Sequence, residues 1–229
     1  PPPRRCCDDR LMSEIQMRAF ALLTGTPVPF RGEEQSAIAK TPVTGPLRIG
    51  FDGFEGNQVA DTVNHGGADK AIHLYPLDHA DFWRERMPGH ASLEEPGAFG
   101  ENIASLGATE DDMCIGDRFR FGSALVEISH GRQPCWKLDH RFGQKGVMAT
   151  IVETARCGIY FRVIEEGFAQ AGDVLTLTDR PLPNWSVSRV FHLLIGKGGK
   201  GDPAAVRELA GMDLLAQAWR GRAVKLAGT

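Results

Sequence analysis

The sequence lacks several features that would assign it at once to a large class of proteins. No apolar run approaches the roughly 20 residues of a membrane-spanning helix, and no charged segment followed by an apolar one opens the chain as in a secretory signal. No basic block is long enough to follow a nucleic-acid backbone, and Lys+Arg 26 against Asp+Glu 29 gives a net charge of −3. We therefore expect a cytoplasmic protein that binds neither a membrane nor a nucleic acid polymer.

Cysteine pairs with the spacing of a metal site are also missing. The spacing of the cysteines includes no C-x-x-C pattern, which argues against a disulfide framework and against a closed zinc site. Cys114 and Cys157 have apolar neighbours, where a cysteine usually packs as a small hydrophobic residue. Cys135 differs because Arg132 and Lys137 lie close to it in sequence and can favour the thiolate. The five cysteines are Cys6, Cys7, Cys114, Cys135 and Cys157.

By composition the chain divides into three stretches. Residues 1–12 look unlike the rest, and we expect them to be a disordered or artefactual leader. Residues 13–180 hold short β-like runs separated by Gly, Pro and Asn, and their close spacing favours a barrel or a sandwich. Residues 181–229 begin in the proline-bearing segment RPLPNW and show helical periodicity. We predict a mainly β protein with some α-helix, ending in a small, independently packed unit of three helices.

Periodicity indicates where strands and helices lie. The clearest strand pair is a hairpin at 117–129 with a Gly-Ser turn. In the C-terminal unit, apolar residues from Val187 to Ile195 fall on one helix face, behind an N-cap at Ser186. Further helices are predicted at 77–87, 146–156, from Asp202-Pro203 to Gly211, and around 214–219. The other expected strands are 16–25, 36–43, 46–51, 57–63, 70–76, 99–105, 159–167 and 173–179.

The segment SHGRQPCWKLDH, residues 129–140, raises the question of what its thiol does. A thiolate can bind a metal or attack an electrophile, and the strand end before Cys135 would hold it in a rigid position. A cysteine packed beside Trp136 is the structural alternative. Hydrolysis with His130 or His140 as the base is another, although the local signatures of cysteine proteases are missing.

Two other segments offer groups that could bind a ligand. In NHGGADKAIHLYP, the glycines allow close approach of the backbone, and His65 and Lys70 could donate to an anion. In GAFGENIASLG, Glu101 and Asn102 stand at the start of a strand. Taken alone, each segment is also explained as a turn. The glycine-rich residues 196–202 lack the G-K-[ST] ending of a phosphate-binding loop.

Together, and in this order, several segments resemble the MOSC domain family, named for the C-terminal domain of molybdenum cofactor sulfurase. The likeness extends over roughly residues 30–222 and is greatest to the YiiM-like branch. It implies a MOSC-type β-barrel followed by a three-helix C-terminal unit. It also implies a molybdenum-dependent reductase of N-hydroxylated compounds such as hydroxylaminopurine, which gives resistance to toxic base analogues. The matching stretches are SAIAK, HGGADKAIHLYP, FGENI, DDMCIGDRFRFGSALVEISHGRQPCWKL and WSVSRVFHLLIG.

The resemblance also implies roles for individual residues. Cys135 takes the position of the family's thiolate ligand to molybdenum, in a cofactor that is Mo-molybdopterin. Arg132 would face the oxo ligands or the pterin, so that Cys135 and Arg132 are the expected catalytic residues. The other expected cofactor-binding residues are His65, Gly66, Gly67, Lys70, Glu101 and Asn102.

The expected partners follow from the resemblance and from motifs that the sequence does not contain. A pyridoxal-phosphate desulfurase domain is missing, and neither that cofactor nor zinc is expected. Cysteine motifs for an iron–sulfur cluster and a flavin fingerprint are missing too, so electrons should come from a separate reductase. The substrate would be an N-hydroxylated small molecule, and a homodimer is allowed for. The alternative is a non-catalytic carrier that holds the cofactor, or a persulfide sulfur, on Cys135.

Overall fold

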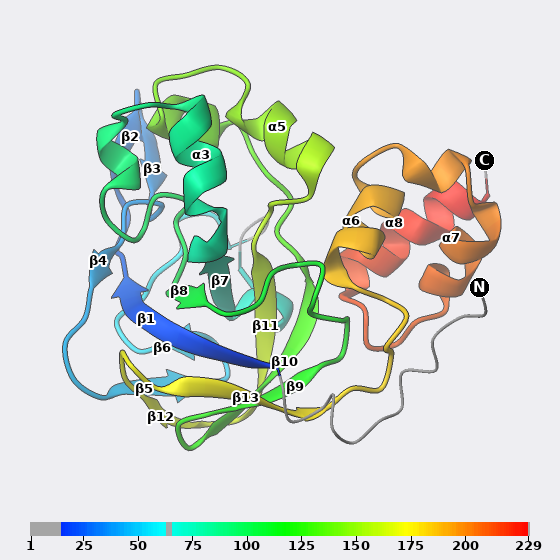
Figure 1. Cartoon of the computed structure of the whole chain (residues 1–229), viewed down its shortest axis with the longest axis horizontal. Coiled ribbons are helices and arrows are strands. Elements are labelled where there is room, and N and C mark those ends of the chain that lie inside the picture. Colours follow the sequence, from blue (N-terminus) through cyan, green and yellow to red (C-terminus); the bar gives the residue numbers. More distant parts are fainter. Residues whose placement is uncertain (1–14, 63–65, 229) are drawn as a thin grey trace.

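The computed structural model describes residues 15–62 and 66–228. Figure 1 shows a β-barrel with short helices over one end and a group of helices packed against its side. The predicted leader at 1–12 lies outside the described residues. Within the described part of the chain, no helix combines the length and the apolar character needed to cross a bilayer.

A closed barrel of seven strands forms the centre of the fold, as the resemblance implied. Each strand pairs with the next around the ring, and β13 pairs with β1 to close it. These pairings are antiparallel except that between β7 and β8, which is parallel. In order around the ring the strands are β1 (Gln16–Thr24), β13 (Val174–Asp179), β9 (Arg118–Phe121), β10 (Ala124–Gly131), β11 (Ile159–Glu165), β7 (Ile72–Pro76) and β8 (Ile103–Leu106).

The hairpin of β9 and β10 forms as predicted and fills the barrel. Phe119 and Phe121 alternate on β9, and Ala124, Val126 and Ile128 alternate on β10; all five side chains are buried. Inward-facing residues of a small barrel fill its interior in this way, because successive side chains of a strand point to opposite faces.

Some of the short strands differ from the prediction. The strand expected at 57–63 is wrong, because described residues 57–62 form no strand. The expected strand at 36–43 is reduced to β4 at its end, and the hairpin of β2 and β3 before it was not predicted. The short strands are β2 (Val28–Arg31), β3 (Glu34–Ser36), β4 (Thr41–Pro42), β5 (Leu47–Gly50), β6 (Gly53–Phe54) and β12 (Gly167–Ala169).

Helices cover the end of the barrel near the cysteine segment (Figure 1). The helices predicted at 77–87 and 146–156 are confirmed, whereas the short α4 directly after Cys135 was not predicted. These elements are η1 (Ala68–Lys70), η2 (Leu77–His79), α3 (Ala80–Arg86), η3 (Ala91–Leu93), α4 (Lys137–Arg141) and α5 (Val147–Thr154).

The C-terminal helices begin and end largely where the sequence predicts. Ser186 Oγ accepts a hydrogen bond from the Arg189 N–H (3.3 Å) at the start of α6 (Val187–Leu194). Asp202 Oδ1 caps α7 (Pro203–Ala210) in the same way, and η4 (Gly198–Lys200) lies between them. The last helix, α8 (Gln217–Ala227), starts later than expected, so that Leu214 lies before it.

These helices share one hydrophobic core with the barrel. Val187 and Phe191 of α6 are fully buried and lie so close to Gly131 of β10 that a Cβ there would be 3.1 and 3.4 Å from them. The Ala216 N–H donates to the Ser129 carbonyl oxygen (3.1 Å), which joins the turn before α8 to β10. The division into a domain at 13–180 and a unit at 181–229 stays a prediction about folding units.

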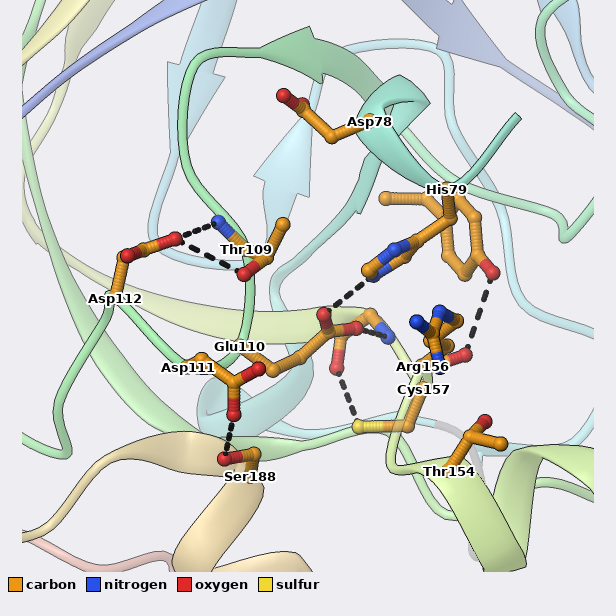
Figure 2. Close-up of polar contacts among 12 residues, drawn as sticks. Asp78, His79, Thr109, Glu110, Asp111, Asp112, Thr154, Arg156, Cys157 and Ser188 are labelled. Atoms are coloured by element: carbon orange, nitrogen blue, oxygen red, sulfur yellow. Dashed lines mark hydrogen bonds and ion pairs between the residues drawn. The ribbon is translucent and has the colours of Figure 1, made fainter. Parts of the chain in front are cut away.

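Polar contacts, some of them buried, also join the helices to the barrel (Figure 2). The Ser188 hydroxyl of α6 donates to Asp111 Oδ1. The neighbouring Glu110 carboxylate contacts His79 Nε2 (2.6 Å) and accepts from the Gly158 N–H (2.6 Å). Because Glu110 and His79 are both buried, this network fixes the loop before β9 against the start of β11.

Candidate functional site

The cysteine segment leaves the barrel at the end of β10. The Arg132 N–H donates to the Gly158 carbonyl oxygen (2.9 Å), so the backbone remains attached to the start of β11. Pro134 follows, and the Leu138 N–H donates to the Cys135 carbonyl oxygen (3.1 Å) as α4 begins. Cys135 is partly exposed and forms no disulfide with another described cysteine. Its thiol is therefore held between a strand end and a helix start while remaining accessible.

A cleft opens beside Cys135, lined by polar and basic side chains from distant segments. Of the predicted site residues, the structure brings Lys70, Asn102 and Arg132 together with Cys135 around this cleft. It adds residues that the sequence did not single out. These are Lys40, Asn57, His73 and Tyr160, and Lys137, named above for its effect on the thiol, lines the cleft as well.

Other predicted residues do not line the cleft. The Glu101 carboxylate accepts hydrogen bonds from the Gly97 N–H (2.6 Å) and the Phe99 N–H (3.0 Å), so it closes its own loop. Gly66 and Gly67 lead into η1, and Gly67 has a φ of 97°, a conformation that favours glycine. His65 lies outside the described residues.

Asn102 lines the cleft, but its amide also holds the wall together. Its Oδ1 accepts from the His73 N–H (3.2 Å), and its Nδ2 donates to the Leu23 carbonyl oxygen (3.1 Å). The side chain thereby joins β7 to β1 across the start of β8. We infer a mainly structural contribution from this residue, because its donors and acceptors already have backbone partners.

Positive charge is concentrated in the cleft at a cost in solvation. Lys40 Nζ donates to Asn57 Oδ1 (2.7 Å), and burial lowers the pKa of Lys40 from 10.5 to about 8, with Glu101 opposing the shift and Arg132 adding to it. Burial also lowers the pKa of Lys70. Cations that lie close together and lose water are stabilised by an anionic ligand.

His73 offers a buried polar atom that has no partner within the described chain. Its side chain is 3% exposed, and Nε2 makes no hydrogen bond to any described residue. Burial, with the nearby Arg132 as the second cause, lowers the pKa of His73 well below its ordinary value, so the imidazole is neutral. Nε2 lies against the backbone of Gly158, where a Cβ would be 2.4 Å away from it.

Tyr160 lies between two imidazoles at the mouth of the cleft. It pairs with His73 across β11 and β7, with ring centroids 5.1 Å apart, and stacks on His130 at 5.2 Å. Burial raises the pKa of Tyr160, whereas Arg132 opposes the shift. The phenol therefore keeps its proton at neutral pH and can donate it to a group in the cleft.

The histidines considered as bases for a cysteine hydrolase are engaged elsewhere. His130 Nδ1 contacts Ser129 Oγ (2.9 Å), and burial lowers the pKa of His130 to about 3. His140 Nε2 contacts the Phe30 carbonyl oxygen (3.3 Å). Within the described chain neither imidazole forms a hydrogen bond with Cys135, and a base with a pKa near 3 is a poor proton acceptor at pH 7.

The remaining described cysteines pack as expected. Cys114 and Cys157 are buried. Cys157 Sγ donates to the Gly158 carbonyl oxygen (3.1 Å), and burial raises the pKa of its thiol well above the ordinary value. Both are therefore structural thiols, in contrast to the accessible Cys135.

Comparison with known proteins finds relatives of similar length and one that is much longer. The MOSC domain profile matches residues 61–176. YflK of Bacillus subtilis strain 168, an uncharacterized protein, is 37% identical over 217 residues, which are 93% of this chain and 96% of YflK. A protein of Gibberella moniliformis called a reductase is 36% identical over 181 residues, 79% of this chain and 32% of that protein. The crystal structure of YiiM from Geobacillus stearothermophilus has a TM-score of 0.78 and 33% identity, covering 92% of this chain and 99% of YiiM.

Proposed function

Because the chain belongs to the MOSC domain family, we propose that it is a molybdenum-cofactor-dependent reductase of N-hydroxylated compounds such as hydroxylaminopurine. The observation that carries the proposal is the accessible thiol of Cys135 at the mouth of a cleft lined by Lys40, Lys70 and Arg132. We also propose that the protein acts in the cytoplasm, where this activity would protect the cell from toxic base analogues.

The chemistry of the cleft fits a molybdenum cofactor. A thiolate is a suitable donor for such a metal, and Cys135 supplies one. The described residues contain no group of three or more His, Cys, Asp or Glu side chains placed to hold a metal, so Cys135 would act as a single protein ligand beside the cofactor's own sulfurs. Lys40, Lys70 and Arg132 suit its anionic groups.

The reaction converts R–NH–OH, two electrons and two protons into R–NH₂ and water. When bound, the cofactor supplies the redox-active metal that passes electrons to the substrate. Cys135 Sγ would anchor that group, and the backbone hydrogen bond of Arg132 to Gly158 fixes the main chain of Arg132, whose side chain lines the same cleft. The Tyr160 hydroxyl lines the cleft and is protonated at neutral pH, so we assign it as the donor of a proton to the departing hydroxyl.

The electrons would come from a separate reductase. The Gibberella relative supports this view, because the matched region makes up 32% of a longer protein that is called a reductase. We propose that such a partner, a protein with its own redox cofactor, reduces the molybdenum site between turnovers.

The test uses protein expressed in a host that makes the molybdenum cofactor. We expect bound molybdenum, and reduction of 6-hydroxylaminopurine to adenine with a chemical electron donor. Cys135→Ser should lose the activity, whereas the matched control Cys114→Ser should keep it, because Cys114 is buried away from the cleft. Purified protein without molybdenum would contradict the cofactor assignment, and molybdenum without reduction with any donor would favour the carrier alternative.

A further inference from the structure

A second groove adjoins the cleft at Cys135. Its residues come from the barrel end and from α8, and it shares Asp61, Lys70, Cys135, Lys137 and Tyr160 with the cleft. Trp219, Arg222 and Lys225 of α8 line its outer wall. Arg222 and Lys225 line the groove but not the cleft, so a ligand held by these two cations would lie beside a cofactor bound in the cleft.

The α8 wall carries positive charge that the helix does not neutralise. Arg222 and Lys225 are three residues apart and face the same groove, and Gln217–Ala227 contains no Asp or Glu. Like charges at this spacing destabilise a helix by a few tenths of a kcal/mol. The Arg222 Nε–H donates to the Leu194 carbonyl oxygen, which fixes the guanidinium. An anion in the groove would offset the repulsion.

The other charged side chains of the groove leave an excess of cations. Asp61 lies near Lys70, where it raises the pKa of that lysine against the larger effect of burial. Glu34 is the other acidic residue of the lining. Against it stand Lys137, Arg222 and Lys225, so a ligand bearing negative charge is favoured.

Aromatic rings also line the groove. Trp219 is packed against His130 (5.3 Å between ring centroids) and Phe191 (6.1 Å), which holds its position in the wall. Trp136 lies next to Cys135 in sequence and is partly exposed, with the Arg31 guanidinium 4.0 Å from its ring centroid. Aromatic walls with a cationic end suit a flat heteroaromatic ring that carries an anionic group.

We propose that this groove binds the substrate, and that the substrate is an N-hydroxylated purine in its nucleoside 5′-monophosphate form. The base lies along Trp136 and Tyr160 near Cys135, and the phosphate lies at Arg222 and Lys225. This inference rests on the proposed reductase function and specifies its substrate class. It also gives the C-terminal helices a part in substrate recognition.

The first test compares two substrates on the cofactor-loaded enzyme. In Lys225→Glu, the KM for 6-hydroxylaminopurine ribonucleoside 5′-monophosphate should rise about tenfold or more, because a charge-assisted contact becomes a repulsion. The KM for free 6-hydroxylaminopurine should stay unchanged, as should the molybdenum content. The matched control is Arg207→Glu, which makes the same charge change on exposed α7 outside the groove and should leave both KM values unchanged.

A binding measurement makes the inference independent of turnover. Titration calorimetry of the purified protein with adenosine 5′-monophosphate and with adenosine should show about tenfold tighter binding of the nucleotide, lost in Lys225→Glu. Equal binding of the two ligands overturns the inference even if free hydroxylaminopurine is reduced. If Lys225→Glu lost molybdenum, Arg222 and Lys225 would bind the cofactor. If only the KM for the electron donor rose, they would bind the reductase. Either result overturns the assignment of the groove to the substrate. A protein that binds the nucleotide more tightly but reduces nothing would refute the proposed function and leave the groove assignment standing.

Discussion

Lys40 should lower the stability of the protein without cofactor, because it is kept charged in a partly desolvated cleft. Burial lowers its pKa from 10.5 to about 8. Each pKa unit corresponds to about 1.4 kcal/mol, so the penalty at pH 7 is up to about 3 kcal/mol. Lys40→Met removes this penalty. It also removes the hydrogen bond to Asn57 Oδ1, which contributes about 1 kcal/mol. Asn57 Oδ1 still accepts a hydrogen bond from the Gly25 N–H (3.2 Å). We expect Lys40→Met to be about 2 kcal/mol more stable.

The pH dependence of this gain has a definite sign. Between pH 8 and 10.5 the unfolded chain binds the Lys40 proton more tightly than the folded protein does. Stability from this group therefore rises with pH through that window, because the folded protein no longer has to bury the charge. From pH 7 to about pH 9.5 the advantage of Lys40→Met should shrink by about 2 kcal/mol.

Urea unfolding of the cofactor-free protein at the two pH values measures the effect. Lys145→Met is the matched control, since Lys145 is exposed and should change stability by less than about 0.5 kcal/mol. Lys40→Met should also reduce molybdenum content in the cofactor-making host, because the lost charge is the one that an anionic cofactor stabilises. A variant that is less stable than the natural protein at pH 7, or a difference that does not change with pH, would refute the reasoning.

Further predictions concern the supports of the site. Glu110→Ala should lower the free energy of unfolding by about 3–5 kcal/mol in urea, because His79 and the Gly158 N–H lose a buried partner; a loss under about 1 kcal/mol would contradict this. Gly158→Ala should destabilise the protein and lower its molybdenum content, since φ is +77° and a Cβ would lie 2.4 Å from His73 Nε2; normal values of both would refute the close packing. Removal of residues 182–229 should give aggregated protein by light scattering, because the truncation uncovers apolar core, whereas a soluble cooperative domain would support two independent units.

The strands of the barrel could be predicted where apolar residues alternate clearly along the sequence. The β9–β10 hairpin combines a Gly-Ser turn with alternating apolar residues, and the capped α6 and α7 have N-cap signals at Ser186 and Asp202. The strand predicted at 57–63 was wrong because β-branched residues alone suggested it, and the described residues of this segment pair with no neighbouring strand. Short segments owe their structure to the neighbours that they meet in the fold.

The site was only partly predictable because strand pairing assembles it. Cys135 and Arg132 stand out by local charge, and Lys70 by its glycine turn. His73 and Tyr160 become neighbours only through the register of β7 and β11, which no local pattern reveals. Lys40 lies within SAIAK, one of the stretches that carried the resemblance, and could have been named from it.

Glu101 shows the opposite case, in which a polar residue in a family-like motif serves the fold. Its carboxylate accepts two backbone hydrogen bonds inside its own loop, and burial raises its pKa. From sequence alone, such a carboxylate cannot be distinguished from one that faces a ligand, because both are buried and hydrogen-bonded.

X-ray absorption spectroscopy at the molybdenum edge tests most directly whether Cys135 holds the metal. The natural protein and Cys135→Ser, both purified from a host that makes the cofactor, should differ by one sulfur ligand, because a serine hydroxyl is a harder and far less acidic donor than a thiol. Circular dichroism should show the same fold in both, since Cys135 is partly exposed and bridges nothing. An equal sulfur count in the two proteins would remove Cys135 from the metal and contradict the central claim.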